Sequence, residues 1–230
     1  MAVAPGGPSP AAMVFDLDGT LVLTEHRNAQ VWRAFFGQHD MDVEAELLHR
    51  LQGRRGIDSL TDLAHRFPTR TLQELAAEVA DIETAIPLDS VQLVAGAHDV
   101  VTRLATGGMP LALVTSGGRS YAQGLLAELG LFDSFSVVVV AEDVSAGKPD
   151  PQGYLTACSR LGVNAADAVG FEDSPAGVAA VKAAGMRCVA VATTVPRDQL
   201  AAADVVLDDF TSFDELEWPP LATAAPGKDS

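Results

Sequence analysis

The chain has 230 residues, of which 48% are hydrophobic and 20% charged, a composition that can bury a core and is unlike that of a disordered protein. Acidic residues outnumber basic ones by 31 to 15, and the formal net charge of -16 argues against nucleic acid or an anionic membrane as the main partner. No apolar run is long enough to span a bilayer, and residues 1–10 lack the features of a signal peptide. We therefore expect a cytoplasmic protein in which Cys158 and Cys188 are reduced and buried.

The first predicted element is a strand in the apolar run that begins at Met13 and ends in the polar turn at residues 16–19. Residues 25–88 then contain helical spacing and no strand-like run, and Thr71 with Glu74 has the spacing of a capping box. The sequence therefore predicts an all-helical insertion directly after the first strand. Ligands bind beyond the carboxyl ends of the strands in an open parallel sheet, so this insertion is a candidate cap over a ligand.

Strand-like and helical segments alternate through the rest of the chain. Short apolar runs, typical of strands buried on both faces, begin at Leu111, Val137, Ala168, Cys188 and Val205. Helical patterns between them open at Asp150 with Pro151 and at Ser174 with Pro175, and they stop at glycine. This alternation predicts an α/β fold with a doubly wound, Rossmann-like parallel sheet.

The pattern also divides the chain. We expect a core formed by residues 11–24 and 89–218 and a cap formed by residues 25–88. The ends, 1–10 and 219–230, are rich in proline, glycine and alanine and are expected to be disordered. We expect a monomer or a weak dimer.

Polar residues follow the predicted strands and define a candidate site. Asp16 and Asp18 are two residues apart in extended chain, so their carboxylates point the same way and can act on one reacting group. One carboxylate can attack while the other transfers protons, and Gly19 lets the chain turn away. Asp173 follows a later strand and adds an oxygen ligand of the kind that Mg²⁺ prefers, beside Glu172.

The same strand ends carry groups that bind phosphate. Thr115 offers a hydroxyl, and Ser116 and Gly117 offer backbone N–H groups at the start of a helix. Lys148, one of three lysines in the chain, offers a fixed positive charge. The sequence therefore predicts a site for a phosphorylated small molecule.

Four segments resemble, in order, the motifs of the haloacid dehalogenase superfamily. They are FDLDGTL from Phe15, LVTSG from Leu113, GKPDP from Gly147 and GFEDSPAGVAAVKAAG from Gly170. A helical cap between the first and second motifs resembles the branch that contains β-phosphoglucomutases and phosphatases of small sugars and polyols.

The resemblance implies a role for each site residue. Asp16 would be the nucleophile that forms an aspartyl phosphate, and Asp18 the general acid for the leaving oxygen and then the general base for water. Mg²⁺ would be held by the Asp16 carboxylate, the Asp18 carbonyl and Asp173, with Glu172 near the metal. Thr115 and Lys148 would hold the phosphoryl group. The other predicted phosphate-binding residues are Gly19, Ser116 and Gly117.

The cap is expected to select the substrate. Residues 53–60 resemble a substrate loop in which sugar and glycerol phosphatases often carry an arginine at the place of Arg55. The predicted substrate residues are Arg54, Arg55, His26, Asn28 and Arg119. The alternatives are that the two loop arginines form a solvated pair and that the histidine and asparagine belong to a plain helix start.

These features favour a Mg²⁺-dependent phosphatase acting on a small phosphorylated sugar or polyol. A phosphosugar mutase of the β-phosphoglucomutase type is the main alternative. Such mutases carry an arginine where this chain has Gly56, a lysine where it has Gly118 and a histidine where it has Asn28. A catalytically inactive binding or regulatory protein is the third possibility, which the complete set of charged motif residues disfavours.

Overall fold

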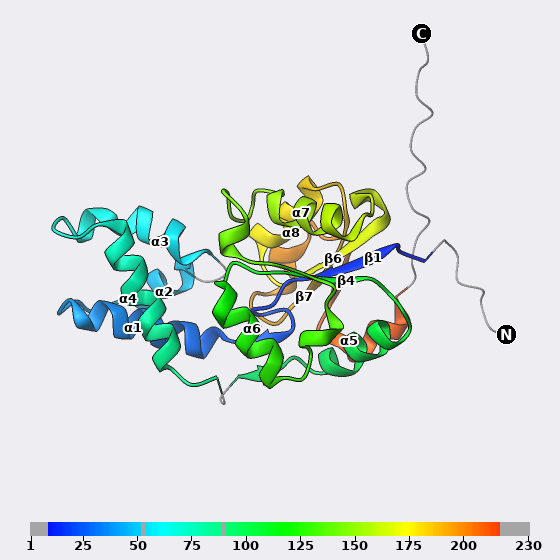
Figure 1. The fold of residues 1–230 in the computed structure, drawn as a ribbon, viewed down its shortest axis with the longest axis horizontal. Helices are drawn as coiled ribbons and strands as arrows, with labels where there is room; N and C mark the ends of the chain where they lie inside the picture. Colours follow the sequence, from blue (N-terminus) through cyan, green and yellow to red (C-terminus); the bar gives the residue numbers. More distant parts are fainter. Residues whose placement is uncertain (1–8, 52–53, 89–90, 217–230) are drawn as a thin grey trace, which may run out of the picture.

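A computed structural model of the chain describes residues 9–51, 54–88 and 91–216. Six parallel strands form the central sheet, in the order β5-β4-β1-β6-β7-β8 (Figure 1). Their bounds are β1 (Ala12–Phe15), β4 (Leu111–Val114), β5 (Val137–Val139), β6 (Ala168–Glu172), β7 (Arg187–Val191) and β8 (Val205–Leu207). All six correspond to predicted strands, so the predicted parallel α/β fold is confirmed. Because β1 pairs with β4 on one side and β6 on the other, the strand order reverses at β1, where such sheets bind ligands.

Helices cover both faces of the sheet. On one face, α5 (Ala97–Thr106) and α6 (Arg119–Glu128) pack on Phe15 and its neighbours. On the other face, α7 (Gln152–Leu161) and α8 (Pro175–Ala183) pack on Val14 and its neighbours. Successive strand residues point to opposite faces, and a strand with helices on both sides must therefore be apolar at every position. This requirement explains the continuous apolar runs in the sequence.

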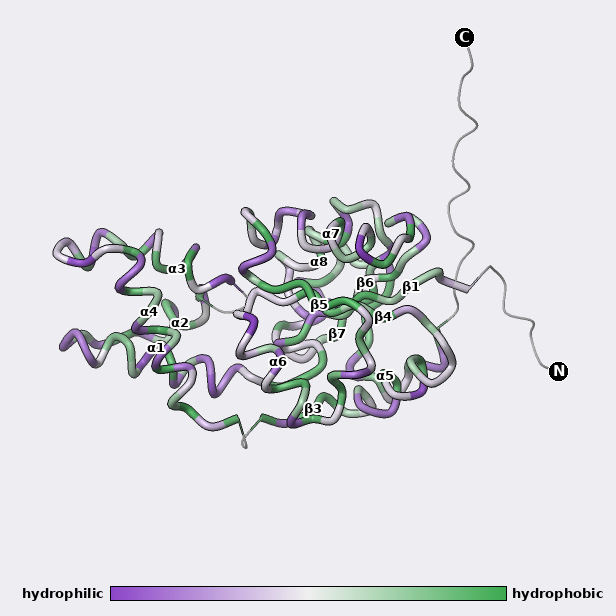
Figure 2. Tube along the Cα trace, in the orientation of Figure 1, coloured by the Kyte–Doolittle hydropathy of each residue, from purple (hydrophilic) through white to green (hydrophobic). Residues whose placement is uncertain are grey.

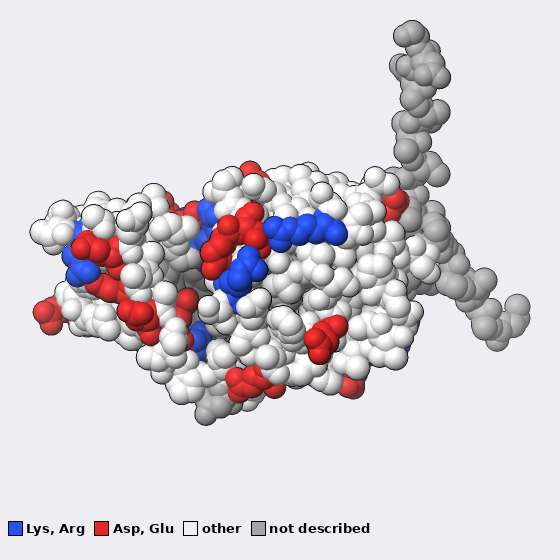
Figure 3. Space-filling view, viewed as in Figure 1, with Lys and Arg blue, Asp and Glu red and all other residues white. Residues whose placement is uncertain are grey.

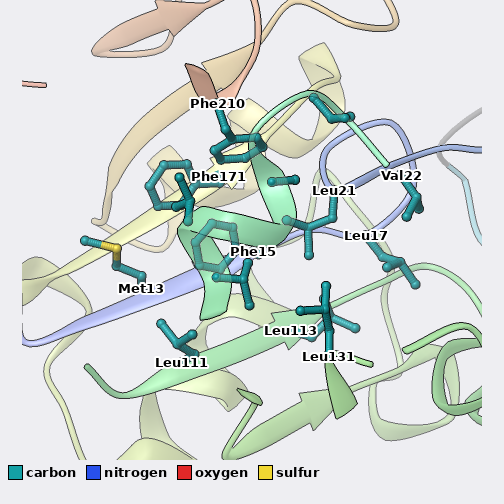
Figure 4. Close-up of a cluster of buried hydrophobic side chains, with 14 of the residues drawn as sticks. Met13, Phe15, Leu17, Leu21, Val22, Leu111, Leu113, Leu131, Phe171 and Phe210 are labelled. Atoms are coloured by element: carbon teal, nitrogen blue, oxygen red, sulfur yellow. The ribbon is translucent and has the colours of Figure 1, made fainter. Parts of the chain in front are cut away.

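Aromatic rings fill the core on the α5 and α6 side (Figure 4). Phe15 and Phe171 come from adjacent strands and stack with their ring centroids 4.4 Å apart. Phe210 closes over both rings at centroid distances of about 6 Å. On the other face Cys158 and Cys188 are buried, free cysteines, as the sequence predicts. The core therefore fixes the strand ends where the candidate site lies.

In the described part of the chain, four α-helices form the cap, for which we use the predicted range 25–88. They are α1 (Glu25–Gln38), α2 (Ala45–Leu51), α3 (Gly56–Leu63) and α4 (Leu72–Ala85), and they lie beside one end of the sheet (Figure 1). Phe35, Phe36 and Leu75 are among the side chains of a hydrophobic cluster separate from those of the sheet. Apolar and polar stretches alternate along the cap helices, whereas the strands are more uniformly apolar (Figure 2). The predicted capping box is confirmed, since Thr71 and Glu74 exchange hydrogen bonds of 3.2 and 2.8 Å.

Two local features differ from the sequence prediction. Strands β2 (Val22–Leu23) and β3 (Gln92–Leu93) pair antiparallel between core and cap, and two residues are too few to show a strand period. Helix α7 begins at Gln152, one residue later than predicted, because the Asp150 carboxylate accepts a hydrogen bond from the Gln152 N–H at 2.9 Å.

Most of the predicted disordered ends lies outside the described residues. Within the described ranges, no helix is long and apolar enough to cross a membrane. The predicted cytoplasmic location and the division at residues 24 and 88 stay predictions.

Candidate active site

Predicted site residues from several strands meet at the carboxyl edge of the sheet. Asp16 follows β1, Thr115 follows β4, and Glu172 ends β6 with Asp173 directly after it. These four side chains are buried, none more than 4% exposed. Lys148 reaches them from the loop before α7. Because β1 lies between β4 and β6 in the sheet, the ends of these three strands bring residues from distant parts of the chain together.

Three of these carboxylates form a compact acidic cluster. Oxygens of Asp16, Glu172 and Asp173 lie within 4.8 Å of one another. Burial raises the pKa of Asp16 well above its ordinary value, because Lys148 opposes this effect only in part and the other carboxylates add to it. Burial and Glu172 likewise raise the pKa of Asp173 to about 7. The Oδ2 atom of Asp16 is buried without a hydrogen-bond partner among the described residues.

This cluster fits a bound Mg²⁺ ion. Mg²⁺ prefers carboxylate oxygens, water and substrate phosphate as ligands. A divalent charge would offset the burial and the carboxylate repulsion that raise the pKa values of Asp16 and Asp173. Asp16, Glu172 and Asp173 offer side-chain oxygens of the required kind. The Asp18 side chain is not part of this cluster. This agrees with the prediction that Asp18 would contact the metal through its backbone carbonyl.

Lys148 carries the positive charge of the site. It forms ion pairs with Asp16 and, at 2.5 Å, with Oε1 of Glu172. Burial alone would lower the pKa of Lys148, but the two carboxylates outweigh it and raise the pKa above its ordinary value. Tyr154 holds the same Glu172 oxygen by donating a hydrogen bond of 2.6 Å. Lys148 therefore stays charged in a site from which water is largely excluded.

Two glycines allow the backbone to approach these carboxylates. Gly19 has φ of +85°, and a Cβ there would lie 2.0 Å from Oδ2 of Asp173. A Cβ at Gly177 would lie 1.9 Å from the Glu172 carboxylate. Any other residue at either position would displace an acidic group. Gly19 was predicted as a phosphate-binding residue, and in the structure it makes room for Asp173.

Asp18 is oriented by hydroxyl groups instead of by the acidic cluster. Its Oδ1 accepts hydrogen bonds from Thr24 at 2.7 Å and from Tyr121 at 2.5 Å. Its Oδ2 lies 3.3 Å from the Thr115 hydroxyl. Asp16 and Asp18 thus have the different surroundings that a nucleophile and a proton carrier need. Sequence reasoning did not assign Thr24, Tyr121 and Tyr154 to the site, because a hydroxyl on a helix or linker has no recognisable spacing relative to the carboxylate that it contacts.

The loop between β4 and α6 forms another wall of the site. The Gly117 N–H donates to the Thr115 hydroxyl at 3.0 Å. Ser116 and Gly117 line the cavity at the start of α6, whose N-cap is Gly118. The structure therefore brings the predicted phosphate-binding residues to the side of Asp18 and Lys148.

A cavity of about 450 Å³ lies between this edge of the sheet and the cap. Asp16, Asp18 and Lys148 line its core side. Its cap side is largely apolar and includes Trp32, Leu48, Leu51, Ile57, Leu60 and Val79. On the molecular face shown in Figure 3, acidic side chains gather over the cap, with basic side chains beside some of them. The cavity therefore joins a charged end to an apolar end.

The structure brings three of the five predicted substrate residues to this cavity. Asn28, Arg54 and Arg55 line it. His26 is exposed and its ring nitrogen lies 3.0 Å from Gln30, one turn along α1. Arg119 turns away to form an ion pair of 2.9 Å with Asp143. Neither of the last two is part of the cavity wall, because each side chain is held by a partner at the surface.

Arg55 connects the cap to the core. Its guanidinium donates to both oxygens of Asp58 at 2.8 and 2.7 Å, and also to the carbonyls of Val144 at 2.9 Å and Ser145 at 3.1 Å. Arg55 is 7% exposed, whereas Arg54 is more exposed and pairs with Asp62 at 2.7 Å. The alternative of a solvated arginine pair is therefore wrong for Arg55, which is held by four hydrogen bonds.

Comparison with known proteins settles the family. The model of the haloacid dehalogenase-like hydrolase family matches residues 10–185. The chain belongs to the haloacid dehalogenase-like hydrolases. The predicted family is thus confirmed, and with it an enzyme of the hydrolase class.

Curated relatives of this chain include phosphatases. Validoxylamine A 7'-phosphate phosphatase from Streptomyces hygroscopicus subsp. limoneus is 41% identical over 208 residues, 90% of this chain and 96% of that protein. Hexitol phosphatase A from Escherichia coli (strain K12) is 33% identical over 208 residues, 90% of this chain and 94% of that protein. The predicted class, a phosphoric monoester hydrolase, agrees with both names.

Among solved structures, β-phosphoglucomutase from Clostridium difficile superposes with a TM-score of 0.78. The superposition covers 90% of this chain and 96% of that one, at 22% identity. At this identity the likeness establishes the shared fold of the haloacid dehalogenase-like hydrolases.

Proposed function

We propose that this haloacid dehalogenase-like hydrolase is a Mg²⁺-dependent phosphatase of small phosphorylated sugars or polyols. One observation carries the proposal: within the described part of the chain, Oδ2 of Asp16 is a buried carboxylate oxygen without a hydrogen-bond partner, beside a second aspartate, Asp18, that hydroxyl groups hold in place. An unpartnered buried oxygen is costly for stability and suits an atom that must react or bind a metal.

The proposed reaction has two steps. Asp16 attacks the phosphorus atom, the bond to the leaving oxygen breaks, and Asp18 donates its proton to that oxygen. Asp18 then takes a proton from a water molecule that attacks the aspartyl phosphate, which releases inorganic phosphate and restores both carboxyl groups. Such division of labour needs two carboxylates in different surroundings, as Asp16 and Asp18 have.

Other residues would bind the phosphoryl group and the metal. Lys148, Thr115 and the Ser116 and Gly117 backbone would hold phosphoryl oxygens. Asp16, Asp173 and the Asp18 carbonyl would hold Mg²⁺, with Glu172 beside it. When bound, the ion would offset the charge between the carboxylates and the phosphate.

The substrate class is inferred from the cavity and from the relatives. The two relatives described above are named for validoxylamine A 7'-phosphate and for a hexitol. Asn28 and Arg54 line the cavity with polar groups that suit hydroxyls, and Trp32 adds to its apolar lining. Arg55 would act on the substrate mainly by holding the cap against the core.

Phosphate release from a panel of sugar and polyol phosphates, with and without Mg²⁺, tests the proposal. We expect Mg²⁺-dependent release from at least one member. No release from any member would contradict it, and conversion of glucose 1-phosphate to glucose 6-phosphate with a bisphosphate primer would favour a mutase instead. Gly56 and Gly118 offer no side chain to hold the second phosphate that a mutase binds.

A further inference from the structure

We propose that Tyr121 is a positioning residue that orients the carboxyl group of Asp18 for proton transfer to the leaving group. The inference rests on the proposed phosphatase function. It concerns a residue that the sequence places on an ordinary helix face.

The contacts of Asp18 fix its rotation. Tyr121, in the first turn of α6, donates a hydrogen bond of 2.5 Å to Oδ1. Thr24 donates to the same oxygen at 2.7 Å, so Oδ1 is occupied by two donors. Oδ2 is the oxygen that faces Thr115, at 3.3 Å, in the loop that lines the cavity. Two donors on Oδ1 hold the carboxyl group in one rotation and leave Oδ2 as the oxygen for proton transfer.

Tyr121 is itself held from the cap. The guanidinium of Arg27, in α1, lies 5.0 Å from the centre of the Tyr121 ring. Arg27 is 4% exposed, and it donates to the carbonyls of Glu83 at 2.5 Å and Ile86 at 3.3 Å, where α4 ends. Arg27 and Tyr121 both line the cavity. Tyr121 therefore lies between Asp18 and Arg27, a buried arginine of the cap that is hydrogen-bonded to the end of α4.

Tyr121 also remains a donor under working conditions. Burial and the adjacent Asp18 carboxylate raise the pKa of the Tyr121 hydroxyl well above its ordinary value. The hydroxyl is thus available to donate to Asp18 in each step of the reaction.

Tyr121→Phe, compared on two substrates, tests the inference. The change removes one hydroxyl and keeps the ring over Arg27. An alkyl phosphate needs a proton on its leaving oxygen, whereas p-nitrophenolate leaves as a stable anion. The ratio kcat/KM reports steps through phosphorylation of the enzyme. We expect kcat/KM to fall roughly tenfold for a sugar phosphate that the wild type hydrolyses and less than about twofold for p-nitrophenyl phosphate.

Tyr154→Phe is the matched control. It makes the same chemical change at the chain's other tyrosine, whose hydroxyl bonds to Glu172 and not to Asp18. We expect it to alter kcat/KM for both substrates by a similar factor. A Tyr121→Phe loss that is equal for both substrates, or absent from both, overturns the inference.

A second variant keeps the test decisive if Tyr121→Phe fails to fold by circular dichroism. Thr24→Val removes the other donor to Oδ1 with almost no change in volume, and we expect the same selective loss. Wild-type protein that hydrolyses neither substrate would instead contradict the proposed function, so the two failures are distinguishable.

Discussion

The two aspartates after β1 differ in their contacts more than in their position. Among the described residues, Oδ2 of Asp16 has no hydrogen-bond partner. Burial raises the pKa of Asp16, an effect that a bound metal ion would offset. Asp16→Asn is nearly isosteric and removes only the nucleophile, so we predict a loss of phosphatase activity of more than about a thousandfold. Phosphate release measures the loss, and an unchanged circular dichroism spectrum shows that the fold is kept. An active Asp16→Asn protein would refute the assignment of the nucleophile.

The Asp18→Asn protein is expected to be blocked at a different step, the hydrolysis of the aspartyl phosphate. In Asp18→Asn the nucleophile remains but water lacks its general base, so we predict slow phosphorylation followed by a stalled aspartyl phosphate. Mass spectrometry of the acid-quenched protein after addition of substrate would detect the mass of one added phosphoryl group. The Asp16→Asn protein, treated in the same way, is the control that should carry no adduct. An unmodified Asp18→Asn protein that turns over normally would contradict the role of Asp18.

At the scale of helices and strands, the sequence predicts what periodicity encodes. The six strands of the sheet are buried on both faces, so their apolar runs are visible without a structure, and Thr71 with Glu74 marks the start of α4. The two-residue strands β2 and β3 escaped prediction because they have no period. The contacts of Tyr121 with Asp18 and Arg27 escaped it because three separate elements create them. The convergence of the motif residues at one edge of the sheet was therefore predictable, and the contacts of the residues around them were not.

Arg55, at the start of α3, connects the cap to the core, and we predict the effect of replacing it. Its planar guanidinium bonds to Asp58 and to the carbonyls of Val144 and Ser145 at once, which a lysine cannot do. We predict that Arg55→Lys lowers kcat/KM about tenfold, because the cap would close less firmly over the substrate. Steady-state kinetics on the best substrate of the panel would measure this.

Arg70→Lys provides the control for that change. Arg70 pairs with Glu74 and Glu78, which both belong to the cap, and it is not among the residues that line the cavity. We expect Arg70→Lys to change kcat/KM by less than about twofold, since exposed ion pairs contribute little. Equal effects of the two substitutions would show that Arg55 has no special part in cap closure.

For the whole molecule, excess negative charge means that specific metal binding at the buried site must be distinguished from loose association with the surface. The chain has a net charge of -16, and acidic groups gather on its surface (Figure 3), so divalent cations will also associate loosely with it. Binding at the buried cluster of Asp16, Glu172 and Asp173 should differ because it relieves repulsion in a site where water screens little. We predict that Mg²⁺ at about a hundredfold excess over its Kd raises Tm by roughly 5–10 °C.

Asp173→Asn separates the two kinds of binding. The substitution removes one ligand from the cluster and changes the net charge by a single unit, so loose association with the surface would be almost unaltered. Thermal unfolding with Mg²⁺ and with excess EDTA should then show a large difference in Tm for the wild type and a small one for Asp173→Asn. An equal Mg²⁺ effect in both proteins would place the stabilising ion on the surface, and no effect in either would count against the metal site.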